Sequence, residues 1–255
     1  MNALKAVEVI FFDAAGTLFD VRGSVGAIYS RIARRHGVDA DPATVQKAFS
    51  NAFRDRSASG FSDRFAGDPV AAERSWWLDV VRAVFARRMS EAVLEEYFDE
   101  VFEAFRRADS YEVFPDTLAS LDRLSSRGFR LGVLSNFDSR LFDVLSGLGL
   151  AGRFERVIIS WGIGAAKPDA GIFLHAAASM GVPEGRILHV GDSLADDYEG
   201  AMNAGMNAVL LDRHGRYRLC RDIARVESLT EVSDLLSRQI VNRQSSIANR
   251  GGLTV

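Results

Sequence analysis

The sequence predicts an α/β protein with a doubly wound parallel sheet and a long helical insertion after the first strand. Five short runs rich in Val, Ile, Leu and Phe predict strands, and from residue 115 onward helical segments separate them; the runs are 7–12, 130–134, 156–160, 187–190 and 208–211. Strands that alternate with helices form right-handed parallel crossovers, which place helices on both faces of the sheet. Residues 21–110 instead carry apolar residues at helical spacing.

The first predicted strand ends at a carboxylate. Its apolar run reaches Phe12 and is followed by Asp13 and by a turn that contains Gly16. Open α/β sheets bind their ligands at the carboxyl ends of the strands. Asp13 is therefore the first candidate functional residue.

The insertion is predicted to be entirely helical. Ser24 is a candidate N-cap for a helix that ends at Gly37, and the pairs Asp41-Pro42 and Asp68-Pro69 are typical helix starts. Apolar residues recur every three or four positions in two further segments: Trp77, Val81, Val84 and Phe85, and then Leu94, Phe98, Val101 and Phe105. We interpret the Trp76-Trp77 pair and the many Phe residues as core packing rather than as a ligand pocket.

The second half of the chain alternates regularly between helix and strand. Helices are predicted over 117–127, after Asp138, over 169–180 and over 194–204, and Gly128 and Gly181 end two of them. The predicted domains are a core of residues 1–20 and 111–240 and a helical domain of residues 21–110. Residues 241–255 are predicted to be a flexible tail because they are polar and contain Gly.

Composition excludes several classes of protein. The chain has 255 residues, 47% hydrophobic content and a net charge of −3, which gives no footprint for nucleic acid or an anionic membrane. The basic stretch from Arg213 to Arg221 is interpreted as a surface loop. Cys220 is the only cysteine, so no internal disulfide exists. With no apparent signal peptide or membrane span, we expect a cytoplasmic protein with a small-molecule substrate. The oligomeric state stays open.

Three more polar clusters follow predicted strands directly. They are Ser135-Asn136, Lys167-Pro168-Asp169 and the acidic group Asp192, Asp196 and Asp197. Parallel strands place their carboxyl ends along one edge, so these clusters are expected to meet Asp13. Carboxylates about 4 Å apart repel by on the order of 4 kcal/mol per pair at an effective dielectric of 20. One lysine cannot offset Asp13, Asp192 and Asp197 together, whereas Mg²⁺, which prefers oxygen ligands, can.

The four clusters together resemble the sequence motifs of the haloacid dehalogenase superfamily. The matching residues are Asp13 to Thr17, Ser135-Asn136, Lys167-Pro168, and Gly191-Asp192 with Asp197, and the resemblance spans residues 7–212. It implies a Rossmann-like sheet of five parallel strands with an all-helical cap over the active site.

The resemblance also implies roles for single residues. Asp13 would be the nucleophile of an aspartyl intermediate, and Mg²⁺ would be held by Asp13, the Ala15 carbonyl and Asp192, with Asp197 as a further acidic candidate. Ser135, Asn136 and Lys167 would contact phosphate, and Thr17 is a further candidate for substrate binding. The expected activity is that of a Mg²⁺-dependent phosphatase acting on a small phosphorylated metabolite.

Ala15 departs from the pattern of such phosphatases. The resemblance implies an Asp at this position, which protonates the leaving oxygen and then activates water. General acid–base catalysis contributes roughly 10² to 10⁴ in rate, so its loss argues against efficient hydrolysis of alkyl phosphate esters. The backbone carbonyl at Ala15 can still bind a metal.

Three other functions stay open at this point. L-2-haloacid dehalogenases also lack the second Asp, but they bind no metal and lack the acidic pair that Asp192 and Asp197 supply. Phosphonoacetaldehyde hydrolases use a cap lysine, for which Lys47 is the candidate here. A phosphate- or protein-binding domain with a catalytically weak site is the third. His189 is interpreted as a packed, hydrogen-bonded residue and Asp138 as a helix cap.

Overall fold

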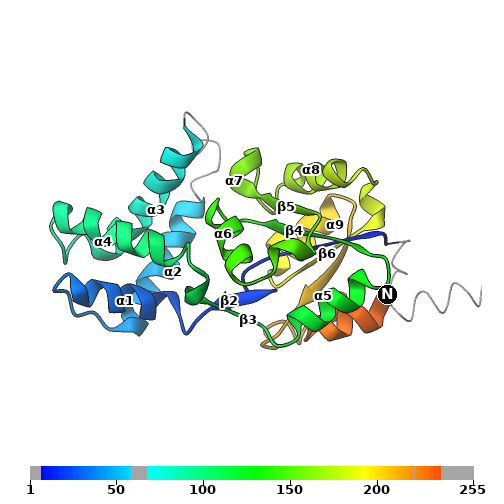
Figure 1. Ribbon diagram of the computed structural model, residues 1–255, viewed down its shortest axis with the longest axis horizontal. Coiled ribbons are helices and arrows are strands. Elements are labelled where there is room, and N and C mark those ends of the chain that lie inside the picture. Colours follow the sequence, from blue (N-terminus) through cyan, green and yellow to red (C-terminus); the bar gives the residue numbers. More distant parts are fainter. Residues whose placement is uncertain (1–6, 59–67, 221, 237–255) are drawn as a thin grey trace, which may run out of the picture.

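A computed structural model of the protein describes residues 7–58, 68–220 and 222–236. Its centre is a parallel sheet (Figure 1). The strands follow one another in the order β5-β4-β1-β6-β7-β8. The strands are β1 (Val9–Phe12), β4 (Arg130–Ser135), β5 (Arg156–Ile159), β6 (Ile187–Gly191), β7 (Asn207–Leu211) and β8 (Arg225–Val226). The five predicted strands are present, and the short edge strand β8 adds a sixth.

The topology opens a crevice beside β1. The chain runs outward through β4 to β5 and then crosses back to β6 on the other side of β1. Such a reversal separates the loops that follow the two strands next to β1, which creates the usual ligand site of a doubly wound sheet. Asp13 follows β1 directly at this point.

Both faces of the sheet are buried, which explains why β1 is apolar throughout. Val9 and Phe11 pack on one face with α8 (Ala170–Met180) and α9 (Gly200–Asn203). Ile10 and Phe12 pack on the other with α5 (Thr117–Ser125), α6 (Arg140–Gly147) and the helical residues 229–236. Strands buried on both faces lose the alternation of apolar and polar residues.

The insertion forms a separate group of four helices, the cap, at one end of the molecule (Figure 1). The helices are α1 (Val25–Arg35), α2 (Pro42–Ala58), α3 (Pro69–Phe85) and α4 (Glu91–Ala104). Ser24 and Asp68 cap α1 and α3 as predicted, since their side chains accept hydrogen bonds from Ala27 N and Val70 N. Buried Tyr29, Phe85 and Tyr97 form the aromatic centre of this group.

A small antiparallel pair of strands joins the cap to the core. It consists of β2 (Phe19–Val21) and β3 (Tyr111–Val113), in which Val21 pairs with Tyr111. The rings of Phe19 and Tyr111 pack edge to face with centroids 5.3 Å apart. Both ends of the insertion are thus held together by the pairing of β2 with β3.

Short helices complete the fold. They are η2 (Ala108–Ser110), η3 (Ala151–Arg153), α7 (Ser160–Ile163), η4 (Glu184–Arg186) and the π-helix η5 (Leu194–Glu199), which continues into α9. Ser160 begins α7 rather than ending β5. The predicted tail, 241–255, lies outside the described residues. Within the described part of the chain, no helix has both the length and the apolar character needed to cross a membrane.

Candidate active site

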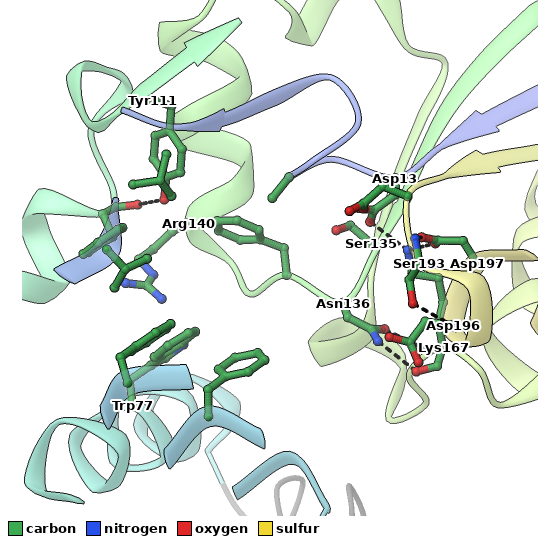
Figure 2. A pocket seen from close by; sticks show the side chains of 18 of the residues that line it. Asp13, Trp77, Tyr111, Ser135, Asn136, Arg140, Lys167, Ser193, Asp196 and Asp197 are labelled. Atoms are coloured by element: carbon green, nitrogen blue, oxygen red, sulfur yellow. Dashed lines mark hydrogen bonds and ion pairs between the residues drawn. The ribbon is translucent and has the colours of Figure 1, made fainter. Parts of the chain in front are cut away.

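The predicted polar residues converge on one cavity of about 300 Å³. Asp13 follows β1, Ser135 ends β4, Lys167 precedes α8, and Asp192 follows β6. All four line this cavity together with Ala15, Asn136, Asp196 and Asp197. Figure 2 shows the side chains of Asp13, Lys167 and Asp197 grouped around the carboxyl ends of the strands.

Lys167 is the cation of the site. Its ammonium donates to Asp13 Oδ1 at 2.7 Å and to Asp197 Oδ1 at 2.5 Å, and all three side chains are buried. Burial alone opposes a charged ammonium, but the two carboxylates outweigh it and raise the pKa of Lys167 above its usual range. Lys167 therefore stays charged and holds one oxygen of Asp13 in place.

Asp197 is fully engaged within the protein. Besides Lys167, its Oδ1 bonds Nε2 of His189 at 2.9 Å, and its Oδ2 accepts from Ser193 N at 3.0 Å. Burial opposes ionisation, but Lys167 and His189 prevail and lower the pKa of Asp197. This carboxylate thus orients Lys167.

Asp192 carries the charge that Lys167 leaves unbalanced. Burial, followed by repulsion from Asp13 and Asp197, raises its pKa to about 7. Oxygens of Asp13, Asp192 and Asp197 can lie within 4.8 Å of one another, which is the arrangement of a metal-binding group. Oxygen donors with excess negative charge suit a hard divalent cation such as Mg²⁺. Asp13 and Asp192 are the best-placed ligands, because the Asp197 oxygens already accept hydrogen bonds.

Two glycines allow these carboxylates to approach the backbone. Gly16 has a φ of 82°, and a Cβ there would lie 2.8 Å from the Asp192 carboxylate. A Cβ on Gly191 would lie 2.2 Å from Cγ of Asp197. Any side chain at either position would displace an acidic group of the site.

The sequence as a whole matches a known family over most of its length. A family model described as haloacid dehalogenase-like hydrolase matches residues 7–205. The chain belongs to the haloacid dehalogenase-like hydrolases. It is 31% identical to haloacid dehalogenase-like hydrolase domain-containing protein 3 of Danio rerio over 234 residues, which cover 91% of this chain and 96% of that protein.

Solved structures of haloacid dehalogenase-like proteins share the fold. The chain resembles a HAD phosphatase from Thermococcus onnurineus with a TM-score of 0.61 and 24% identity, over 90% of this chain and 98% of that one. It resembles a dehalogenase with a TM-score of 0.70 and 22% identity, over 91% and 97% of the two chains. Because both identities are low, these likenesses establish the fold alone.

The structure places the three remaining predicted substrate-binding residues of this haloacid dehalogenase-like chain in different surroundings. The Asn136 side chain bonds the Lys167 backbone twice, with Nδ2 donating to the carbonyl and Oδ1 accepting from the amide, each at 2.8 Å. Its amide therefore positions Lys167, while Asn136 itself lines the cavity. Thr17 is fully buried and does not line the cavity, so the structure does not support substrate contact by its side chain. Ser135 lines the cavity as predicted.

The structure also tests the two less certain residues and the cap lysine. His189 is a packed, hydrogen-bonded residue as interpreted, but its partner is Asp197 of the site itself. Asp138 Oδ1 accepts a hydrogen bond from Arg140 N at 3.0 Å, as a helix cap would. Asp138 also binds the Arg140 guanidinium and the Trp77 indole. Lys47 is exposed on α2 and does not line the cavity, so it is not placed to act as a Schiff-base lysine.

Sequence reasoning missed the cap side of the site. Arg140 is buried, bonds Asp138 through Nε and Nη2 at 2.9 and 2.5 Å, and stacks 4.8 Å from the Trp77 ring centroid. Trp77 Nε1 donates to Asp138 Oδ2 at 2.6 Å. The earlier interpretation of the aromatic residues as core is correct for Trp76, whereas Trp77, Phe49, Phe53 and Phe105 line the cavity. The abundance of aromatic residues in the insertion was the only available signal.

Proposed function

We infer that the protein hydrolyses phosphoric monoesters with Asp13 as nucleophile and with the help of Mg²⁺. The observation that carries this proposal is the pairing of Asp13 with Lys167 at 2.7 Å beside the unbalanced carboxylate of Asp192. A carboxylate that attacks an anionic substrate needs positive charge around it, and one lysine supplies too little.

The residues divide the chemistry between them. The free oxygen of Asp13 attacks phosphorus, the bond to the leaving oxygen breaks, and an aspartyl phosphate forms. Water then attacks that phosphorus, the P–O bond to Asp13 breaks, and inorganic phosphate leaves. The proton that water loses passes through solvent to the departed alkoxide or aryloxide. Lys167 offsets charge on Asp13 and would offset charge on the phosphoryl oxygens, and the Ser135 hydroxyl, which lines the cavity, would donate to one of them. Mg²⁺ bound by Asp13, Asp192 and the Ala15 carbonyl would neutralise phosphate charge.

Ala15 determines which esters suit this site. It lines the cavity next to Asp13 but cannot donate a proton. The leaving oxygen therefore departs with its negative charge, which favours groups whose conjugate acids have a low pKa. Fast substrates are expected to be aryl or acyl phosphates.

Hydrolysis of p-nitrophenyl phosphate tests the proposal. We expect turnover with Mg²⁺ that is lost with a chelator and in Asp13→Asn, by at least about 10³-fold for the variant. Equal rates for the wild type and Asp13→Asn would overturn the proposed function.

Dehalogenation is the second candidate, and Ala15 favours it because a halide needs no protonation to leave. Asp192 argues against it, since an extra buried carboxylate gives no advantage beside a carboxylate substrate. Halide release from L-2-chloropropionate in the presence of chelator would decide in its favour.

A further inference from the structure

The cavity has two chemically different ends. Near the strand ends it is bordered by the carboxylates and Lys167, whereas Tyr111, Arg140 and Trp77 lie at the opposite side in Figure 2. Seven aromatic side chains line it: Tyr29, Phe49, Phe53, Trp77, Phe105, Tyr111 and Phe137. The part of a substrate that extends from Asp13 toward the cap therefore meets mainly rings.

These rings form a preassembled wall. Tyr29 packs edge to face on Phe49 and Phe105, with centroids 5.5 and 5.8 Å apart, and Phe53 lies 5.8 Å from Trp77. Five of the rings come from α1, α2, α3 and the end of α4, so every cap helix contributes, and Tyr111 and Phe137 come from β3 and the loop after β4. Rings already held by their neighbours lose little freedom when a ligand binds.

Several polar side chains at this end already have partners within the protein. The Tyr111 hydroxyl donates to the Phe105 carbonyl at 2.9 Å, and the Trp77 indole donates to Asp138. Asp138 also neutralises the guanidinium of Arg140. A leaving group with several hydroxyls would exchange its hydrogen bonds with water for contacts with rings, which is unfavourable. A flat apolar group makes no such hydrogen bonds with water and would pack on the rings.

We propose that the substrates are phosphoric monoesters of apolar, aromatic compounds rather than of sugars or other polyols. This inference rests on the proposed phosphatase function and adds the class of the leaving group. A cavity of about 300 Å³ is at the small end for ligand pockets, so the leaving group is a small ring system. Ala15 is consistent with it, because a phenol leaves with less need for a proton than an alkyl alcohol.

The test must separate ring binding from leaving-group chemistry. We compare 2-phenylethyl phosphate with glycerol 1-phosphate, since both release a primary alcohol without a proton donor at Ala15. The expected result is a kcat/KM at least about tenfold higher for 2-phenylethyl phosphate, the scale on which apolar pockets discriminate. Equal values, or a preference for glycerol 1-phosphate, would overturn the proposal.

A cavity variant and a matched control locate the effect. Phe53 is 37% exposed and lines the cavity, and Phe142 is 48% exposed on α6 and does not, so neither substitution removes a buried core residue. Phe53→Ser should reduce the ratio of kcat/KM for the two esters severalfold, through KM, and Phe142→Ser should leave it unchanged. The ratio is measured within each variant, so a partial loss of folded protein cancels. An unchanged ratio in Phe53→Ser would contradict an aromatic leaving-group site.

Binding of stable analogues separates this proposal from the function on which it rests. By calorimetry with Mg²⁺, benzylphosphonate should bind at least about tenfold more tightly than 3-hydroxypropylphosphonate, whether or not any ester is hydrolysed. Tighter binding of benzylphosphonate without turnover of any ester would refute the phosphatase and keep the aromatic site. Turnover without any preference for the ring would refute the aromatic site and keep the phosphatase.

Discussion

Lys167 is the residue on which the charge balance of the site depends. Its ammonium lies between Asp13 and Asp197, and the Asn136 side-chain amide bonds both the N–H and the carbonyl of its backbone. The position is too enclosed for the broad planar fork of arginine, which is notable in a chain whose other cations are nearly all arginine.

Replacing Lys167 should therefore remove activity even when the positive charge is kept. We expect Lys167→Met and Lys167→Arg each to lower kcat for p-nitrophenyl phosphate by about 10² or more, because the compact donor to Asp13 is lost or misplaced. Lys47→Met, at an exposed site on α2, is the control and should retain full activity. An active Lys167→Arg variant would show that charge alone suffices.

Asp192 makes stability depend on pH when no metal is bound. Its native pKa of about 7 lies above its ordinary value of 3.8, so the native state holds this proton more tightly than the unfolded state. The contribution of this group to the free energy of unfolding is complete below pH 3.8 and is lost as the pH rises through about 7.

Neutralising this residue should accordingly stabilise the metal-free protein more and more as the pH rises. In chelator, Asp192→Asn should gain free energy of unfolding relative to wild type between pH 5 and pH 8, by on the order of 2 to 3 kcal/mol. Denaturant titrations at both pH values measure it. With Mg²⁺ at pH 8 the order should reverse, because only the wild type binds the ion through this carboxylate. A difference that does not change with pH would contradict the assignment.

Ala15 offers a substitution that should improve the enzyme. Ala15→Asp would place a carboxyl group at the edge of the cavity beside Asp13 and could supply the missing proton. We expect alkyl phosphates to gain up to about 10² in kcat/KM while p-nitrophenyl phosphate changes little, since nitrophenolate leaves without help. If the wild type already cleaves both kinds of ester at similar chemical-step rates, another residue donates the proton.

At the scale of elements, the turn after β1 combines a left-handed backbone conformation with a close contact. Gly16 adopts a positive φ, its amide bonds the Phe19 carbonyl at 2.8 Å, and its Cα hydrogen faces Asp192. The turn directs the chain from the nucleophile into β2 and so into the cap. Gly23, only a few residues later, has a similar φ of 77° with nothing within 4 Å of a Cβ.

These two glycines form a matched pair for experiment. Gly16→Ala and Gly23→Ala should each lose about 1 kcal/mol of stability from the left-handed backbone. Only Gly16→Ala should also weaken Mg²⁺ binding and phosphatase activity, because its Cβ displaces the Asp192 carboxylate. Calorimetry and thermal unfolding of both variants check this. Unimpaired Mg²⁺ binding in Gly16→Ala would mean that Asp192 is not a ligand.

At the scale of the whole molecule, a polar network fastens the cap to the core. Asp138, on the core side, binds both Arg140 and the Trp77 indole of α3. Nearby, Glu73 of α3 accepts from the backbone amide and the hydroxyl of Ser139, at 3.1 and 2.9 Å. The position of the aromatic wall relative to Asp13 depends on these contacts.

Removing the charge of Asp138 should lower the free energy of unfolding more than removing the hydrogen bond from Trp77. Asp138→Asn leaves the buried charge of Arg140 without its partner and should lower the free energy of unfolding by about 3 kcal/mol or more. Trp77→Phe keeps that ion pair, loses one hydrogen bond and should cost about 1 to 2 kcal/mol. Denaturant unfolding of both variants gives the order, and an equal loss would mean that the ion pair is not the main fastening.

The sequence by itself determined the fold class and the residues that follow the strands. Runs such as Val9–Phe12 are apolar because both faces of the sheet are covered, and parallel strands end along one edge. For that reason Asp13, Lys167 and Asp192 could be placed together before their distances were known. The helix caps at Ser24 and Asp68 could also be predicted, because each depends on residues only two or three positions away.

Only the tertiary structure decided what surrounds those residues. Trp77 and Asp138 are 61 positions apart and meet because the cap folds onto the core, which no local pattern encodes. The partner of Asn136, the bond from His189 to Asp197, and the two-residue β8 likewise depend on packing between distant segments. Local order follows from backbone propensity and hydrophobic periodicity, whereas side-chain partners follow from the close packing of elements far apart in the chain.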